Sequence, residues 1–152
     1  MKRVSLILAL VLLVSLFFYP AAGASGVQFL SDEMACVKLA GSFIRDVVEG
    51  EIEKAFNDVK PYFPITQTEF EDLLSSTRSQ LKGTEPNFGK MLGYKFIREE
   101  RVKDFLVRFT FIIKHELTVT RWRFLFYRPE NKWLLNSLHW DDRVDNLFQA
   151  GG

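Results

Sequence analysis

The chain has 152 residues, of which 47% are hydrophobic, 14% aromatic and 26% charged. Its 20 basic and 19 acidic residues nearly balance, which disfavours a nucleic acid or an anionic membrane surface as the partner. The single cysteine, Cys36, excludes an internal disulfide, and we expect it to be a small buried apolar side chain on a helix.

The N-terminal segment has the features of an export signal. Lys2 and Arg3 supply positive charge, residues 4–18 are apolar apart from two serines, and an A-G-A sequence ends at Ala24. The apolar run is shorter than the roughly 20 residues of a membrane-spanning helix. We predict cleavage near Ala24 and a periplasmic or secreted single domain over 25–152, without a stable membrane span. A retained anchor is the alternative.

Helical periodicity then covers residues 31–82. Ser31 is expected to cap a first helix, which Gly50 ends. A shorter helix is expected over 51–59, followed by two prolines that break it.

A third helix has the clearest start signal. Thr66-Gln67-Thr68-Glu69 has the pattern of a capping box, in which the side chains of residues 66 and 69 bond reciprocally to the backbone. We expect this helix to end at Gly83. An irregular loop is expected from Gly83 to Gly93, because it contains a proline and further glycines.

From Tyr94 onward the apolar period changes to two, which is typical of strands. Strands are expected over 94–100, 105–114, 117–127 and 133–140. Three helices followed by four strands predict an α+β fold, with the helices packed on a curved four-stranded antiparallel sheet.

This order of elements resembles the nuclear transport factor 2-like superfamily, which has a cone-shaped α+β fold. The similarity covers about residues 31–148 and includes the segments FIRDVVEGEIEKAFNDV, FLVRFTFIIKHE and TRWRFLFYRPENKWLLNSLHWDD. It implies a cavity between the sheet and the helices. No catalytic motif of the superfamily's enzymes matches this chain, so the resemblance implies no catalytic residue. The superfamily also contains transport factors and immunity proteins, so it implies no single function.

Two polar pairs are candidate site residues. His139 and Asp141 are two apart on an expected strand, so they share a face and can act as an acid–base pair; a solvated strand end is the alternative. Arg121 and Arg123 also share a face. They can bind a carboxylate or phosphate if that face is concave, or lie solvated over the sheet if it is convex.

The aromatic residues of the last two strands are expected to form the core of the sheet, and lining an apolar pocket is the alternative. Trp122, Phe124 and Trp140 are the candidates for such a pocket. His115 and Glu116 lie at a strand end, and together with His139 they do not make a recognisable metal site. We therefore expect neither a metal nor a cofactor.

The sequence thus favours an exported, non-catalytic domain that binds a small apolar or anionic ligand or a protein partner. One alternative is a cavity enzyme of isomerase, lyase or hydrolase type that uses His139 or Asp141 with Arg121 or Arg123. Another is a structural or inhibitory partner protein that uses the outer sheet surface as an interface. A homodimer is the expected assembly.

Overall fold

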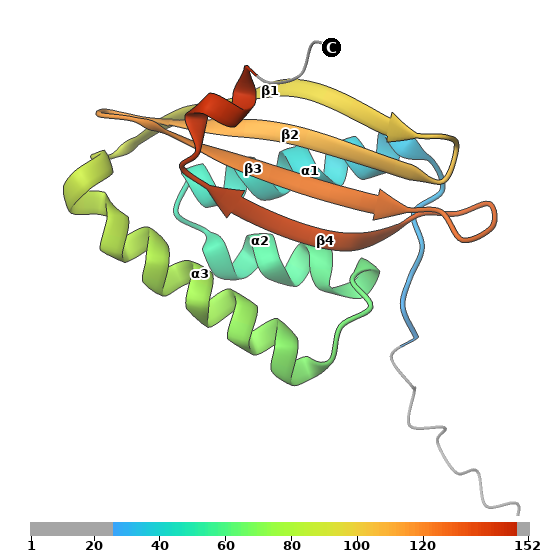
Figure 1. The fold of residues 1–152 in the computed structure, drawn as a ribbon. Coiled ribbons are helices and arrows are strands. Elements are labelled where there is room, and N and C mark those ends of the chain that lie inside the picture. Colours follow the sequence, from blue (N-terminus) through green and yellow to red (C-terminus); the bar gives the residue numbers. More distant parts are fainter. Residues whose placement is uncertain (1–25, 149–152) are drawn as a thin grey trace, which may run out of the picture.

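The computed structural model describes residues 26–148, and the predicted export signal lies outside these residues (Figure 1). Three helices precede four strands, and the two kinds of element are segregated along the chain. The helices are α1 (Glu33–Val48), α2 (Ile52–Val59) and α3 (Gln67–Phe88), with a 3₁₀ turn η1 (Lys60–Tyr62) after α2. The strands are β1 (Met91–Val102), β2 (Leu106–His115), β3 (Val119–Tyr127) and β4 (Leu134–Asp141), followed by a 3₁₀ turn η2 (Val144–Leu147).

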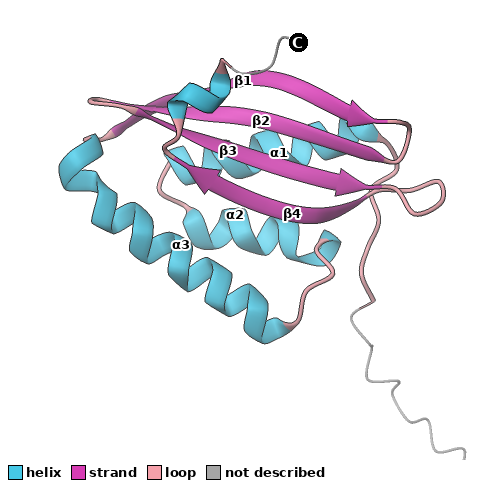
Figure 2. Ribbon diagram, viewed as in Figure 1, coloured by secondary structure: helices cyan, strands magenta, loops and turns pink. Residues whose placement is uncertain are grey.

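The four strands form one antiparallel sheet in the order β1-β2-β3-β4, so each strand pairs with its neighbour in sequence. The three helices lie on one side of this sheet, as Figure 2 shows. We call that side of the sheet the inner face. Above the opposite, outer face lies η2, where the Arg98 guanidinium donates a hydrogen bond of 3.0 Å to the carbonyl of Leu147. The predicted α+β class is confirmed.

Aromatic side chains of β2 and β3 meet the first helix on the inner face. In the register of these strands Phe109 lies opposite Phe124, and Phe111 lies opposite Trp122. The ring of Phe43, on α1, packs edge-on to Phe124 at 5.3 Å and against Trp122 at 5.9 Å. Such contacts bury large apolar areas, so the alternating aromatic residues of β2 and β3 form mainly core.

The inward stripe of α1 is fully buried. Cys36 belongs to it, with no exposed surface, and burial raises the pKa of its thiol to about 12. The thiolate is therefore strongly disfavoured, and the expected small buried side chain is confirmed. The buried residues of this stripe are Cys36, Ala40, Phe43, Ile44 and Val47.

Helix starts differ from the sequence prediction in one case. Asp32, not Ser31, caps α1, because its carboxylate accepts a hydrogen bond of 2.8 Å from the Ala35 N–H, and the Ser31 hydroxyl donates to that carboxylate. The prediction of Ser31 as the cap was wrong by one residue. The capping box of α3 is confirmed, with both reciprocal bonds between Thr66 and Glu69 present.

The end of α3 was predicted wrongly. The helix continues past Gly83 and includes Pro86 in its last turns, and Gly89 follows it at φ +74°. A helix-interior glycine costs only about 1 kcal/mol relative to alanine, so it does not by itself stop a helix. Glycine adopts a positive φ at a lower cost than any other residue, so Gly89 is suited to this helix end.

Because α3 is longer, the expected irregular loop is largely absent and β1 begins at Met91, three residues before the predicted start. Two irregularities, at Met91/Gly93 and Phe96/Arg98, interrupt its pairing with β2. Phe105, expected to begin the second strand, instead lies in the preceding turn and is 39% exposed.

Candidate ligand site

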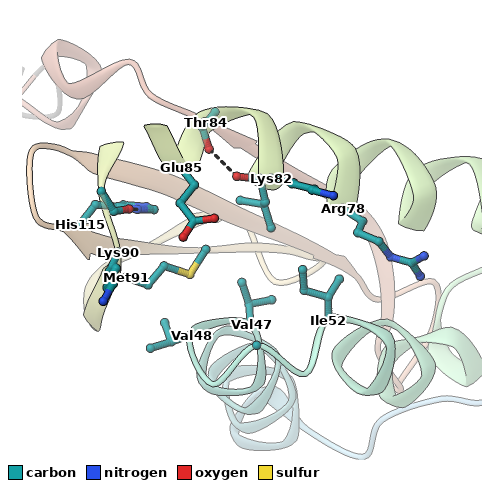
Figure 3. A pocket seen from close by; sticks show the side chains of 13 residues that line it. Val47, Val48, Ile52, Arg78, Lys82, Thr84, Glu85, Lys90, Met91 and His115 are labelled. Atoms are coloured by element: carbon teal, nitrogen blue, oxygen red, sulfur yellow. Dashed lines mark hydrogen bonds between the residues drawn. The ribbon is translucent and has the colours of Figure 1, made fainter. Parts of the chain in front are cut away.

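A cavity of about 340 Å³ opens between the three helices and one end of the sheet (Figure 3). Its apolar wall comes from the last turn of α1, the start of α2 and the second half of α3, and β1 and β2 close the far side. The residues of this wall are Val47, Val48, Ile52, Leu81 and Met91, together with His115 at the end of β2.

A buried carboxylate fixes the turn between α1 and α2 beneath this wall. Asp46 is 3% exposed and accepts hydrogen bonds from Arg45, at 3.1 and 3.2 Å, and from Lys54. Burial alone would raise the pKa of Asp46, but the hydrogen bonds from Lys54 and Arg45 outweigh it and hold the pKa below its usual value. Gly50, at φ +85°, then reverses the chain into α2. The turn thereby holds the start of α2 beside the end of α1.

His115 forms part of the cavity wall in a defined protonation state. Its Nε2 lies 3.1 Å from the Thr120 hydroxyl, which also accepts a hydrogen bond of 3.1 Å from the Trp122 indole. The hydroxyl is then free to donate to Nε2, which places the imidazole proton on Nδ1, 3.5 Å from the Gly89 carbonyl. Burial lowers the pKa of His115, so the neutral ring is favoured.

The rim of the cavity carries more positive than negative charge. Arg78, Lys82 and Lys90 are basic, and Glu85 is acidic. Arg78 forms an ion pair with Glu53, so Lys82 and Lys90 face one carboxylate among the lining residues, and the Glu116 carboxylate, beside the lining, accepts a hydrogen bond of 3.0 Å from the Lys90 N–H. An apolar wall beneath a positive rim suits a small molecule that has an apolar body and an anionic group.

The aromatic residues singled out by the sequence lie on the inner face but outside this lining. Trp122 and Phe124 have no exposed surface, and both belong to the core. Trp140 stacks on Trp122, with ring centroids 5.4 Å apart and planes 12° from parallel. It also borders a separate shallow hollow with Phe88 and Asp142. Their role in binding stays a prediction.

The predicted polar pairs lie on the outer face, away from the cavity. Arg121 and Arg123 donate hydrogen bonds of 2.8 and 3.0 Å to the same oxygen of Asp141. Burial raises the pKa of Asp141, but hydrogen bonds from Arg121 and the Arg143 N–H outweigh it, so the pKa lies below its usual value. His139, exposed beside these residues, lies opposite Arg123 in the register. As a result Asp141 acts as the carboxylate of an ion-pair cluster, and the predicted acid–base role of His139 with Asp141 stays a prediction.

Sequence reasoning missed most of the cavity. Its lining comes from five elements, and Lys90 and Met91 fall in a segment that we expected to be an irregular loop. His115 was considered only as a metal ligand, together with His139, but the two rings lie on opposite faces of the sheet. The pair Val47-Val48 was a usable sequence signal for an apolar cavity wall. It lies two residues before the turn at Gly50, so it places two apolar side chains at the end of α1.

Within residues 26–148, no cluster of three or more histidine, cysteine, aspartate or glutamate side chains could hold a metal ion. In the same part of the chain, no helix has the length and apolar character needed to cross a bilayer. Comparisons with protein-family models, curated proteins and solved structures gave no match to this chain.

Proposed function

We propose that this chain is a non-catalytic binding domain that holds a small carboxylate with an apolar body in the cavity at His115. The observation that carries the proposal is the cavity itself, with apolar walls and Lys82 and Lys90 at its rim. Its volume of about 340 Å³ is near the lower end of the roughly 300–1,000 Å³ typical of ligand pockets, so the ligand should be small.

The proposal includes two further points that rest on the sequence. The order of helices and strands supports membership of the nuclear transport factor 2-like superfamily. The resemblance of the chain to this superfamily implied a cavity between the helices and the sheet. The N-terminal segment that ends at Ala24 supports export, so the ligand would be met in the periplasm or outside the cell.

The state of His115 supports binding in place of catalysis. Both ring nitrogens face partners of the protein, Thr120 and the Gly89 carbonyl, and the ring is neutral. A general base needs a free lone pair within reach of the proton that it removes, and the Nε2 lone pair of this imidazole already faces the Thr120 hydroxyl. It therefore contributes a polar edge to the wall.

The test is a calorimetric titration with three probes of equal chain length: octanoate, 1-octanol and octylamine. We expect octanoate to bind most tightly, because the rim favours a negative head group, and octylamine to bind most weakly. Equal affinity for all three probes would remove the proposed role of the rim.

Variants locate the probe. Val48→Trp fills the cavity and should abolish octanoate binding, whereas Met34→Trp, at the exposed start of the same helix, should leave it unchanged. Lys82→Gln should weaken octanoate but not octanol, and Lys38→Gln on the surface of α1 is its matched control. Undiminished octanoate binding by Val48→Trp would place the ligand elsewhere.

A further inference from the structure

On the outer face, Arg108, Arg121 and Arg123 share the carboxylates of Glu100 and Asp141, and a fourth arginine, Arg98, lies 3.4 Å from the same Glu100. Arg108 forms a forked pair with Glu100, at 2.8 and 2.7 Å, and Arg121 forms a forked pair with Asp141, at 3.2 and 2.8 Å. Arg123 donates one hydrogen bond to Asp141, whose two oxygens Arg121 already engages. Among Arg108, Arg121, Arg123, Glu100 and Asp141, which we call the arginine cluster, one positive charge has no carboxylate of its own.

Two buried polar atoms lie in or beside this cluster. Thr110 is opposite Arg123 in the pairing of β2 with β3, and it has no exposed surface. The Thr110 hydroxyl oxygen and the Arg123 Nε are both buried and have no hydrogen-bond partner in the part of the chain that the structure describes. An unsatisfied buried polar group costs about 1–3 kcal/mol, so an acceptor that reached both the Arg123 Nε–H and the Thr110 hydroxyl would remove this cost.

The electrostatics of the cluster agree with the hydrogen bonding. Burial, and after it the positive charge of Arg121, lower the pKa of Arg123, and Arg108 acts in the same direction. The side chains of Arg123 and Arg108 are nevertheless 32% and 41% exposed, so solvent reaches both guanidinium groups. An anion from solution can therefore approach the two guanidinium groups, and it reaches the buried Thr110 hydroxyl only when the side chains that cover this hydroxyl move aside.

We propose that the outer face binds a small tetrahedral oxyanion, of phosphate or sulfate type, between Arg108 and Arg123, with the Thr110 hydroxyl as a third donor. The donors come from two strands and from the sheet surface beneath, so they do not lie in one plane, which suits a tetrahedral group. Guanidinium groups match the oxygen spacing of such anions. This site is separate from the proposed carboxylate cavity at His115, which opens on the inner side of the sheet.

The test follows the arginine Nε–Hε signals by NMR during a titration with sodium phosphate, and with sodium chloride at matched ionic strength. We expect the Arg123 signal to move saturably with phosphate only. Phenyl phosphate identifies the source of the oxyanion: tighter binding than phosphate indicates a phosphate ester, and weaker binding indicates the free ion. The same displacement by chloride at equal ionic strength would overturn the proposal.

Variants separate a binding role from a structural one. Thr110→Val preserves shape and should weaken phosphate about tenfold, because it removes one hydrogen bond to a charged group. Arg123→Gln should abolish the saturable shift, read at Arg108, while Asp141 keeps its forked pair with Arg121. Arg78→Gln, an arginine in an ion pair at the inner cavity, is the control and should bind phosphate normally. Wild-type affinity in Thr110→Val would overturn the proposal even if Arg123→Gln failed to fold.

Discussion

The two faces of the same strands differ in what stabilises them. On the inner face of β3, Trp122 and Phe124 have no exposed surface and pack against α1. On the outer face, Arg121 and Arg123 alternate with them along the strand and bond to the carboxylate of Asp141. A strand with period two thus places apolar burial and charge pairing within one residue of each other. We therefore expect the stability of the fold to depend on side-chain volume at the inner face and on side-chain charge at the outer face.

The largest expected effect is on the inner face. Phe124→Ala removes a fully buried ring and should lower the free energy of unfolding by about 3–5 kcal/mol, measured by urea denaturation. Its neighbour Leu125, partly exposed on the outer face, is the matched control. Leu125→Ala should cost about 1 kcal/mol or less. Similar losses at the two positions would contradict the difference between the faces.

A smaller effect is expected at the outer face. Asp141→Asn leaves Arg121, whose side chain is 7% exposed, without its carboxylate, and should cost about 2 kcal/mol at neutral pH. Asp104→Asn is the control, because its exposed pair with Arg128 contributes within about 0.5 kcal/mol.

The same variant tests the sign of the pH dependence. Because the pKa of Asp141 is lowered in the folded protein, its stabilisation is present above the unfolded value of about 3.9 and is lost as pH falls through the folded pKa. The stability difference between wild type and Asp141→Asn should therefore stay constant between about pH 5 and 7 and shrink below about pH 4. A difference that persists undiminished at lower pH would show that the carboxylate charge is not its cause.

The smallest effect concerns His115 on the inner side. Burial lowers its pKa, so its neutral form is fully compatible with folding above about pH 6.5, and stability declines as pH falls from there toward the folded pKa. In His139→Asn, His115 is the only histidine left in the chain, so its ring signals are unambiguous in an NMR titration. We expect a midpoint below about 6.5. A midpoint above that value would mean that the ring is not desolvated in the cavity wall.

The difference between the faces was predictable from sequence because it follows from alternation alone. Trp122 and Phe124 had to lie on one side of β3, and Arg121 and Arg123 on the other. Which side meets the helices is decided by packing with Phe43 on α1, a contact between segments about 80 residues apart. The local sequence pattern therefore predicted which residues share a face of the sheet, but it did not predict where the ligand sites lie.

The end of α3 and the cavity could not be predicted for a related reason. Gly83 and Pro86 are breakers by local propensity, but the helix continues through them to the glycine that can adopt a positive φ. That extension moves Lys90 and Met91 to the edge of the cavity. The lining is a consequence of where five elements end, and no short motif in the sequence encodes it.

The central claim is that a small anionic ligand with an apolar body binds on the inner side, between helices and sheet. Methyl NMR during an octanoate titration tests it most directly, because each side of the sheet has its own methyl groups. The account predicts saturable shifts at Val48, Ile52 and Met91, with Leu106 and Leu125 on the outer face unchanged. Shifts confined to Leu106 and Leu125 would contradict it and place the ligand on the outer face.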